Sequence, residues 1–367
     1  LDRKIGQMLM VGFRGTELQP DAFILEAIRR HHLGGVILFD YDVQHKRPER
    51  NITSPRQLQN LIRTLQQAAK VPLLIAVDQE GGRVARLKEK YGFPATPSHR
   101  ELGQRDDPAR TAAEAGRIAA TLADVGITVN FAPVVDLCSN PDNPVIARLG
   151  RCFSPQPARV TRHALAYIRA HQQAGVATVL KHFPGHGSSR DDSHLGFTDV
   201  TATWAPDELQ PYADLIAADA VSAVMTAHVF NAGVDPDHPA TLSAATITGM
   251  LREQLGFDGV VFSDDLQMAA ISEHYGLEQA VRLALLAGVD ILLFGNNLNY
   301  DPEIVPRVVA IIRTLIAEGH ISEERVDQSY RRIKRLKKSR TMPADVDSGG
   351  RRNLPGVSAL CGYCEQE

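Results

Sequence analysis

The sequence has few cysteines, no long apolar run and little net charge, and each of these shortages excludes a class of protein. Four cysteines in 367 residues are too few for a disulfide framework in a chain of this size. No apolar run reaches the roughly 18 to 20 residues that cross a bilayer, so we expect no membrane span. A formal charge of −3 provides no basic surface for nucleic acid or anionic membranes, so we expect neither as a partner.

Two local features near the C-terminal end have plain interpretations. The basic run at 331–338, R-R-I-K-R-L-K-K, is read as the solvated end of a helix. Cys361 and Cys364 form a single C-x-x-C without a second pair or nearby histidines, which makes a poor zinc site, and we treat them as tail sequence. Otherwise the composition, 44% hydrophobic and 23% charged, is that of a globular protein with a sizeable core.

Short, β-branched apolar runs recur along the chain and are separated by longer segments with helical periodicity. The runs cover residues 7–13, 35–39, 73–78, 127–133, 177–182, 223–228, 259–264 and 290–295. Their nearly continuous apolar character predicts parallel strands buried on both faces, with helices such as 54–70 and 242–256 as crossovers. Eight such runs favour an α/β fold of the (β/α)8 TIM barrel type.

We therefore predict one catalytic domain over residues 1–338 and an irregular C-terminal tail over residues 339–367. A doubly wound open sheet is the alternative fold, but no G-x-G-x-x-G motif follows any of the runs. Polar residues gather where the runs end, namely Asp78, Asn130, Lys181, His182, His228, Asp264 and Asn296. In a TIM barrel these ends converge on one mouth, where active sites are built.

The stretch 181–194, K-H-F-P-G-H-G-S-S-R-D-D-S-H, concentrates ionisable groups after one of the runs. Its competent metal ligands are His182, His186, Asp192 and His194. A proline and a glycine between the first two histidines prevent the helix that would put them on one face, which argues against a metal site. No G-x-S-x-G motif supports a nucleophile loop either. A loop rich in glycine and serine is expected to have few packing anchors and to be mobile.

Asp192 and His194 stand two residues apart, so in an extended loop their side chains point the same way and can hydrogen-bond. A carboxylate beside an imidazole fixes its tautomer and stabilises its protonated form, which suits a general acid that later acts as a base. The plain alternative is a solvated loop with no role in chemistry.

Two further stretches contain carboxylates at predicted strand ends. In 256–268, G-F-D-G-V-V-F-S-D-D-L-Q-M, Asp264 ends the run and is expected to point into the mouth, while Asp265 is predicted to be the N-cap of the next helix. A carboxylate at the mouth, near a separate acid, is the arrangement of a retaining glycosidase. In 77–87, V-D-Q-E-G-G-R-V-A-R-L, Asp78 and nearby arginines could hold sugar hydroxyls or form a rim salt bridge.

Taken together, these stretches resemble family 3 glycoside hydrolases, in particular the single-domain bacterial β-N-acetylhexosaminidases that remove N-acetylglucosamine. The family pattern K-H-F-P-G-H-G followed by D-S-H is present at 181–187 and 192–194. D-Q-E-G-G-R-V is present at 78–84 and S-D-D-L at 263–266. The resemblance extends from the first apolar run to about residue 338. One departure is Ser188 and Ser189, where relatives usually carry Asp-Thr.

The resemblance implies roles for individual residues. Asp264 would be the nucleophile and His194, paired with Asp192, the acid/base. The residues expected to hold the hydroxyls of the terminal sugar are Asp78, Arg86, Arg151, Lys181 and His182, with His228 at the rim. No metal and no cofactor are implied.

The resulting hypothesis is a retaining exo-β-N-acetylglucosaminidase acting on peptidoglycan fragments or related oligosaccharides, through a covalent glycosyl-aspartate. The alternatives are a β-N-acetylglucosaminide phosphorylase, a β-glucosidase of the same family, a metal-dependent hydrolase on a TIM barrel, and a sugar-binding barrel without catalysis. We expect a monomer whose partner is a small carbohydrate. The chain begins with Leu1 rather than Met, so we expect that an N-terminal segment has been removed. The compartment stays open between the bacterial cytoplasm and the periplasm or exterior.

Overall fold

The computed structural model describes residues 1–192, 196 and 198–339, and each predicted apolar run contains a parallel strand. The strands are β1 (Leu9–Gly12), β2 (Gly35–Ile37), β5 (Leu74–Val77), β6 (Val129–Asn130), β7 (Ala177–Thr178), β8 (Leu180–Phe183), β10 (Ala223–Thr226), β12 (Val260–Phe262) and β13 (Leu292–Phe294). The short strands outside these runs are β3 (Tyr41–Asp42), β4 (Arg47–Pro48), β9 (Thr198–Asp199) and β11 (Val229–Phe230).

The strands of the two larger sheets pair in parallel, and the last of them, β13, pairs with the first, β1. One sheet has the order β13-β1-β2-β5-β6-β7, and a second has the order β12-β10-β8. The register places Leu9 beside Leu292 on one side of β1, and Met10 beside Gly35 on the other. Isolated parallel bridges at Val134–Lys181 and Phe262–Ile291 connect segments of the two sheets. The result is a TIM-barrel-like α/β fold with a parallel sheet, and complete closure of the barrel stays a prediction.

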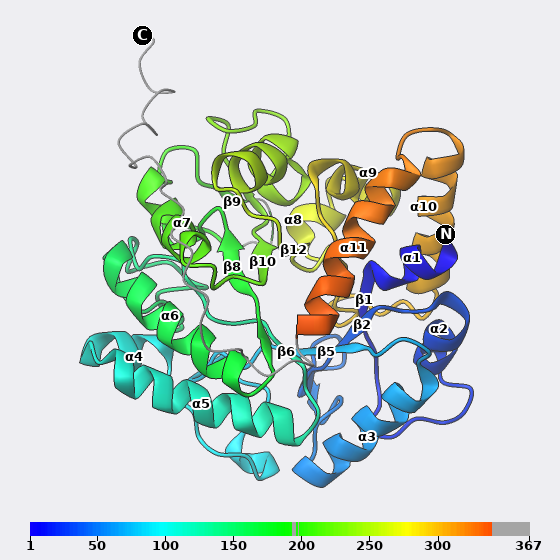
Figure 1. Ribbon diagram of the computed structural model, residues 1–367, viewed down its shortest axis with the longest axis horizontal. Coiled ribbons are helices and arrows are strands. Elements are labelled where there is room, and N and C mark those ends of the chain that lie inside the picture. Colours follow the sequence, from blue (N-terminus) through cyan, green and yellow to red (C-terminus); the bar gives the residue numbers. More distant parts are fainter. Residues whose placement is uncertain (193–195, 197, 340–367) are drawn as a thin grey trace.

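Figure 1 shows the helices on the outside of the molecule, around the strands. The α-helices are α1 (Asp2–Gln7), α2 (Phe23–His31), α3 (Pro55–Ala68), α4 (His99–Arg105), α5 (Pro108–Asp124), α6 (Pro157–Gln173), α7 (Gln210–Ala217), α8 (Ala269–Ser272), α9 (Gly276–Ala287), α10 (Ile304–Ala317) and α11 (Glu323–Ser339). The 3-10 turns are η1 (Glu89–Tyr91), η2 (Pro206–Leu209) and η3 (Ala240–Leu242), and η4 (Ala245–Gln254) is a π-helix.

The structure confirms a helix start and a helix stop that the sequence predicts. Ser54 is the N-cap of α3, and its side chain accepts a hydrogen bond of 3.2 Å from the Gln57 amide, with Pro55 in the first turn. Gly256 follows η4 with a φ of 70°, the left-handed conformation that favours glycine after a helix. Among the helices that the structure describes, none is long and apolar enough to cross a bilayer.

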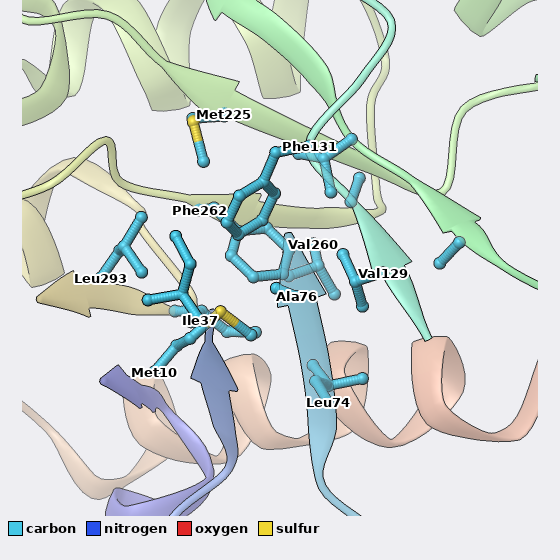
Figure 2. Packing of buried hydrophobic residues seen from close by; sticks show 14 of the residues in the cluster. Met10, Ile37, Leu74, Ala76, Val129, Phe131, Met225, Val260, Phe262 and Leu293 are labelled. Atoms are coloured by element: carbon cyan, nitrogen blue, oxygen red, sulfur yellow. The ribbon is translucent and has the colours of Figure 1, made fainter. Parts of the chain in front are cut away.

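The main hydrophobic core lies between the strands and between the strands and the surrounding helices. Figure 2 shows side chains from different strands pointing toward one another, among them Met10, Ile37, Leu74, Val129, Met225 and Leu293. The rings of Phe131 and Phe262 meet edge to face, with their centroids 5.5 Å apart. This packing fixes the positions from which the strand ends present their polar side chains.

Candidate active site

A cavity of about 360 Å³ lies at the C-terminal ends of the strands. The predicted site residues that line it are Asp78, Arg86, Arg151, Lys181, His182, Asp192 and Asp264. Lys181 and His182 lie in β8, and the others come from segments that follow β5, β6, β8 and β12. Residues far apart in the sequence thus meet in one place, as TIM-barrel geometry requires. Of the other two predicted residues, His228 is not among the lining residues that the structure describes, and His194 lies outside the described residues.

Lys181 is the centre of the charged group at the bottom of this cavity. Its side chain is only 2% exposed, and its Nζ lies 2.7 Å from Asp78 Oδ1 and 2.8 Å from Glu80 Oε1. Arg86 Nη2 contacts the other oxygen of Asp78 at 3.4 Å. Burial alone would raise the pKa of Asp78, but the charges of Lys181 and Arg86 outweigh it and hold that pKa below its ordinary value.

Glu80 is a buried partner that the sequence analysis did not identify. Arg151 donates to it as a fork, from Nε to Oε2 and from Nη2 to Oε1, both at 2.8 Å. Burial opposes ionisation, yet the charges of Arg151 and Lys181 keep the pKa of Glu80 well below its ordinary value. Its position two residues after Asp78 could have indicated that both side chains point to the same side, because alternate residues of an extended segment face the same way.

His182 is oriented by Asp136, a second residue that the sequence analysis missed. The ring Nδ1 lies 2.7 Å from Asp136 Oδ2, and Nε2 lies 3.2 Å from Arg151 Nη2. These two contacts, one at each ring nitrogen, fix the orientation of the imidazole. The other oxygen of Asp136 accepts the backbone amides of His182 and His186, at 3.1 and 2.8 Å. Burial opposes the ionisation of Asp136, but its histidine contacts hold its pKa below the ordinary value.

Asp264 lies on the cavity wall directly after β12 and is partly buried. Its Oδ1 accepts the amide of Asp265 at 2.7 Å, which fixes the direction of the carboxylate. Together, these positions place a carboxylate, a buried charged cluster and Asp192 around the same space.

The sequence of this chain also matches a family of known proteins. Residues 1–336 match the glycosyl hydrolase family 3 N terminal domain. The chain belongs to glycoside hydrolase family 3. It is 35% identical to beta-hexosaminidase A of Pseudoalteromonas piscicida over 91% of this chain and 60% of that protein. It is 40% identical to a beta-hexosaminidase of Tolumonas auensis over 79% of this chain and 83% of that protein.

Solved structures of the family are also similar. A family 3 beta-N-acetylglucosaminidase from Paenibacillus sp. superposes with a TM-score of 0.85 at 38% identity, over 97% of this chain and 65% of that one. A beta-N-acetylhexosaminidase from Beutenbergia cavernae gives 0.81 at 32% identity, over 92% and 98%. The predicted family is thus confirmed, and the chain spans less than two thirds of the length of some relatives.

The predicted role of Asp265 in this family 3 chain is wrong. Helix α8 begins at Ala269 with Met268 as its N-cap, so a turn separates Asp265 from the helix. The Asp265 carboxylate instead accepts the amides of Gln267 and Gly295, at 3.0 and 2.9 Å, and so ties this turn to the end of β13.

His228 supports the same turn from behind. Its Nε2 lies 2.9 Å from the Asp265 carbonyl oxygen and its Nδ1 lies 2.8 Å from Thr241 Oγ1. His228 as a whole is 1% exposed. The structure therefore places His228 behind the Asp264 segment, and contact with a sugar at the rim stays a prediction.

The loop that leads to Asp192 is better anchored than its composition suggests, at least over its first half. Residues 185–189 are buried, and Ser189 Oγ lies 2.6 Å from His186 Nδ1. Asn143 donates to the His186 carbonyl oxygen at 2.8 Å and to Ser189 Oγ at 3.0 Å. A side chain on Gly187 would collide with the Leu137 carbonyl oxygen. The expectation of few packing anchors is wrong for this part of the loop.

A disulfide that the sequence analysis did not predict encloses a segment that lines the cavity. Cys138 and Cys152 are bonded, with 14 residues of sequence separation. The enclosed segment contributes Val145, Leu149 and Arg151 to the cavity lining. Cys361 and Cys364 lie outside the described residues. Within residues 1–192 and 198–339, no group of three histidine, cysteine or carboxylate side chains is placed to hold a metal ion.

Proposed function

We propose that this chain is a retaining exo-β-N-acetylglucosaminidase that removes terminal β-linked N-acetylglucosamine from peptidoglycan fragments or related oligosaccharides. The observation that supports this most is the shared cavity, in which Asp264 faces the space bounded by the buried cluster around Lys181. The names of the related proteins, beta-hexosaminidase and beta-N-acetylglucosaminidase, point to the same reaction. We also propose that the parallel strands close into a complete eight-stranded barrel around this cavity.

The buried cluster suits the hydroxyls of a neutral sugar. Asp78 offers acceptor oxygens held in the charged state by Lys181 and Arg86. Arg86 also lines the cavity, where its Nη2 contacts Asp78 at 3.4 Å, so its guanidinium is held beside the acceptor oxygens. Donors and acceptors fixed in advance by neighbouring charges cost little to reorganise when the substrate binds.

In the proposed mechanism, the carboxylate of Asp264 attacks the anomeric carbon while His194, supported by Asp192, gives its proton to the leaving oxygen. His194 then takes a proton from the water that hydrolyses the glycosyl-aspartate, so the anomeric configuration is retained. Proton transfer by a positioned side chain is typically worth about 10² to 10⁴ in rate.

Two experiments test these roles. The variant His194→Ala should lose far less activity on an activated aryl glycoside, whose leaving group needs no proton, than on a disaccharide. Equal loss on both substrates would contradict the assignment. A 5-fluoro sugar should label Asp264 covalently, detected by peptide mass spectrometry, and labelling of Asp265 instead would reverse our choice of nucleophile.

The activity itself is tested with 4-nitrophenyl N-acetyl-β-glucosaminide beside the corresponding glucoside, with and without phosphate. We expect cleavage of the first substrate to free N-acetylglucosamine in both buffers. A sugar phosphate as product would indicate a phosphorylase, and preference for the glucoside would indicate a β-glucosidase.

A further inference from the structure

The hairpin of β3 and β4 alternates between buried acids and exposed apolar side chains at the edge of the cavity. Asp40 and Asp42 are each 1% exposed, whereas Tyr41 and Val43 are 42% and 43% exposed. Successive side chains of an extended segment point to opposite sides, so the two apolar residues share one face. Both of them line the cavity.

Exposed apolar side chains of this size are uncommon in the part of the chain that the structure describes. Four large hydrophobic residues are exposed there, and they are Leu1, Tyr41, Val43 and Leu286. Two of the four therefore stand on one short hairpin beside the cavity. Grouped apolar side chains at the mouth of a cavity are typical of a binding surface. The hairpin is therefore a candidate binding surface for a ligand.

Contacts between Asp42 and two arginines hold the hairpin in place on its buried side. Asp42 accepts from Arg14 Nε at 2.7 Å and from Arg50 Nη1 at 2.9 Å. Burial opposes ionisation of Asp42, but these two cations lower its pKa to about 2. A platform that is fixed in this way loses little conformational entropy when a ligand packs on it.

The neighbouring loop after β13 holds the same hairpin from the side. Asn297 Oδ1 accepts the amide of Val43 at 3.0 Å, and Asn297 Nδ2 donates to the Tyr41 carbonyl oxygen at 3.1 Å. Asn297 and Leu298 also line the cavity, so Leu298 extends the apolar surface of the hairpin.

Asp40 anchors the start of the hairpin from its buried side. One of its oxygens, Oδ2, pairs with Lys88 Nζ at 2.5 Å. The other, Oδ1, is buried and has no hydrogen-bond partner among the described residues, although Asp40 lines the cavity. The Asp40 carboxylate therefore belongs to the buried support of the hairpin rather than to the exposed face that carries Tyr41 and Val43.

The position of the hairpin decides which part of the substrate it contacts. The cluster around Lys181 is buried and polar, while Tyr41 and Val43 are exposed at the opening. An enzyme that removes a terminal sugar encloses that sugar and leaves the rest of the substrate at the opening. We propose that Tyr41, Val43 and Leu298 form the binding site for the leaving group, a second pyranose whose C–H face stacks on the Tyr41 ring. This inference rests on the proposed function.

The test compares leaving groups of different size in the variant Tyr41→Ala. The substrates are the N-acetylglucosamine β-1,4-disaccharide, N-acetylglucosaminyl-anhydromuramic acid and methyl N-acetyl-β-glucosaminide. We expect kcat/KM to fall about fivefold to tenfold on both disaccharides, the size of one aromatic packing contact, and to stay unchanged on the methyl glycoside. Tyr41→Trp should keep the activity on the disaccharides.

The matched control is Leu286→Ala, which removes an equally exposed apolar side chain, 44% exposed, from helix α9. It should leave all three substrates unaffected. Unchanged activity of Tyr41→Ala on the disaccharides, or equal loss on the methyl glycoside, would overturn the inference.

A binding measurement separates this inference from the proposed function. Calorimetry would measure the affinity of the unaltered chain and of Tyr41→Ala for the two disaccharides and for the methyl glycoside. If none of the three ligands is hydrolysed but Tyr41→Ala binds only the two disaccharides more weakly than the unaltered chain does, the proposed function fails and the leaving-group site stands. If the variant binds all ligands as the unaltered chain does, the leaving-group site is refuted.

Discussion

Replacing Glu80 by glutamine tests whether the charge of this buried residue holds the active-site cluster together. The substitution keeps the side-chain volume and removes the charge. Glu80 is fully buried and accepts three charge-assisted hydrogen bonds, two from Arg151 and one from Lys181, each at 2.8 Å. In Glu80→Gln the Arg151 charge loses its carboxylate, while Lys181 keeps Asp78.

The expected loss is large because a buried cation is left without compensation. Removing one partner of a buried ion pair typically costs about 3 to 5 kcal/mol. Since Lys181 retains one carboxylate, we expect the lower end, about 3 kcal/mol, in the free energy of unfolding measured with urea at pH 7. Glu26→Gln is the control, because Glu26 forms an exposed pair with Arg30 and is 51% exposed. Such surface pairs contribute about 1 kcal/mol or less.

The pH dependence gives an independent check. The pKa of Glu80 is lowered in the folded chain from an ordinary value of 4.5. Its contribution is therefore complete above about pH 4.5 and is lost as the pH falls through the lower folded pKa. The difference in stability between the unaltered chain and Glu80→Gln should narrow as the pH falls below about 4.5. A loss under about 1 kcal/mol at pH 7, or a difference that stays constant in acid, would refute this account of the cluster.

Two further predictions concern buried and partly buried groups outside the cavity lining. Burial, assisted by the charge of Asp136, raises the pKa of Glu208 to about 8, so stability should decline between about pH 4.5 and 8, by at most about 1.4 kcal/mol per pH unit. Urea unfolding of Glu208→Gln should show less decline, and an unchanged slope would contradict the assignment. The double variant Cys138→Ser with Cys152→Ser should lose about 3 kcal/mol, the value for a loop of this length. The double variant should also bind substrate more weakly, because Arg151 is the residue before Cys152. Thermal unfolding identical to that of the oxidised chain would show that the disulfide does not contribute to stability.

The strands and the convergence of their polar ends could be predicted because both follow from local sequence pattern. Each apolar run is short, β-branched and followed by a polar residue, and parallel strands place such residues at one edge. Asp78, Lys181 and Asp264 were found in this way, without knowledge of any contact between them.

The partners of these residues could not be predicted, because they depend on contacts between distant segments. Glu80 and Arg151 are 71 positions apart, and Asp136 and His182 are 46 apart. Nothing in the local sequence distinguishes a carboxylate that orients a histidine from one that ends a strand. The disulfide could not be predicted for the same reason, since Cys138 and Cys152 are recognisable as a pair only from their Cα separation of 5.6 Å.

The balance of charge around the cavity bears on the choice between water and phosphate as the acceptor of the sugar. Among the residues that the structure describes, three lysine and arginine side chains line the cavity, those of Arg86, Arg151 and Lys181. Five carboxyl groups line it as well, those of Asp40, Asp78, Asp192, Asp264 and Asp265. All three cations already contact carboxylates, so little positive charge is left to attract an anion. A phosphate ion would enter against the carboxyl groups, whereas a neutral sugar and water meet no such repulsion. The described part of the cavity therefore favours hydrolysis, and product analysis with added phosphate tests this directly.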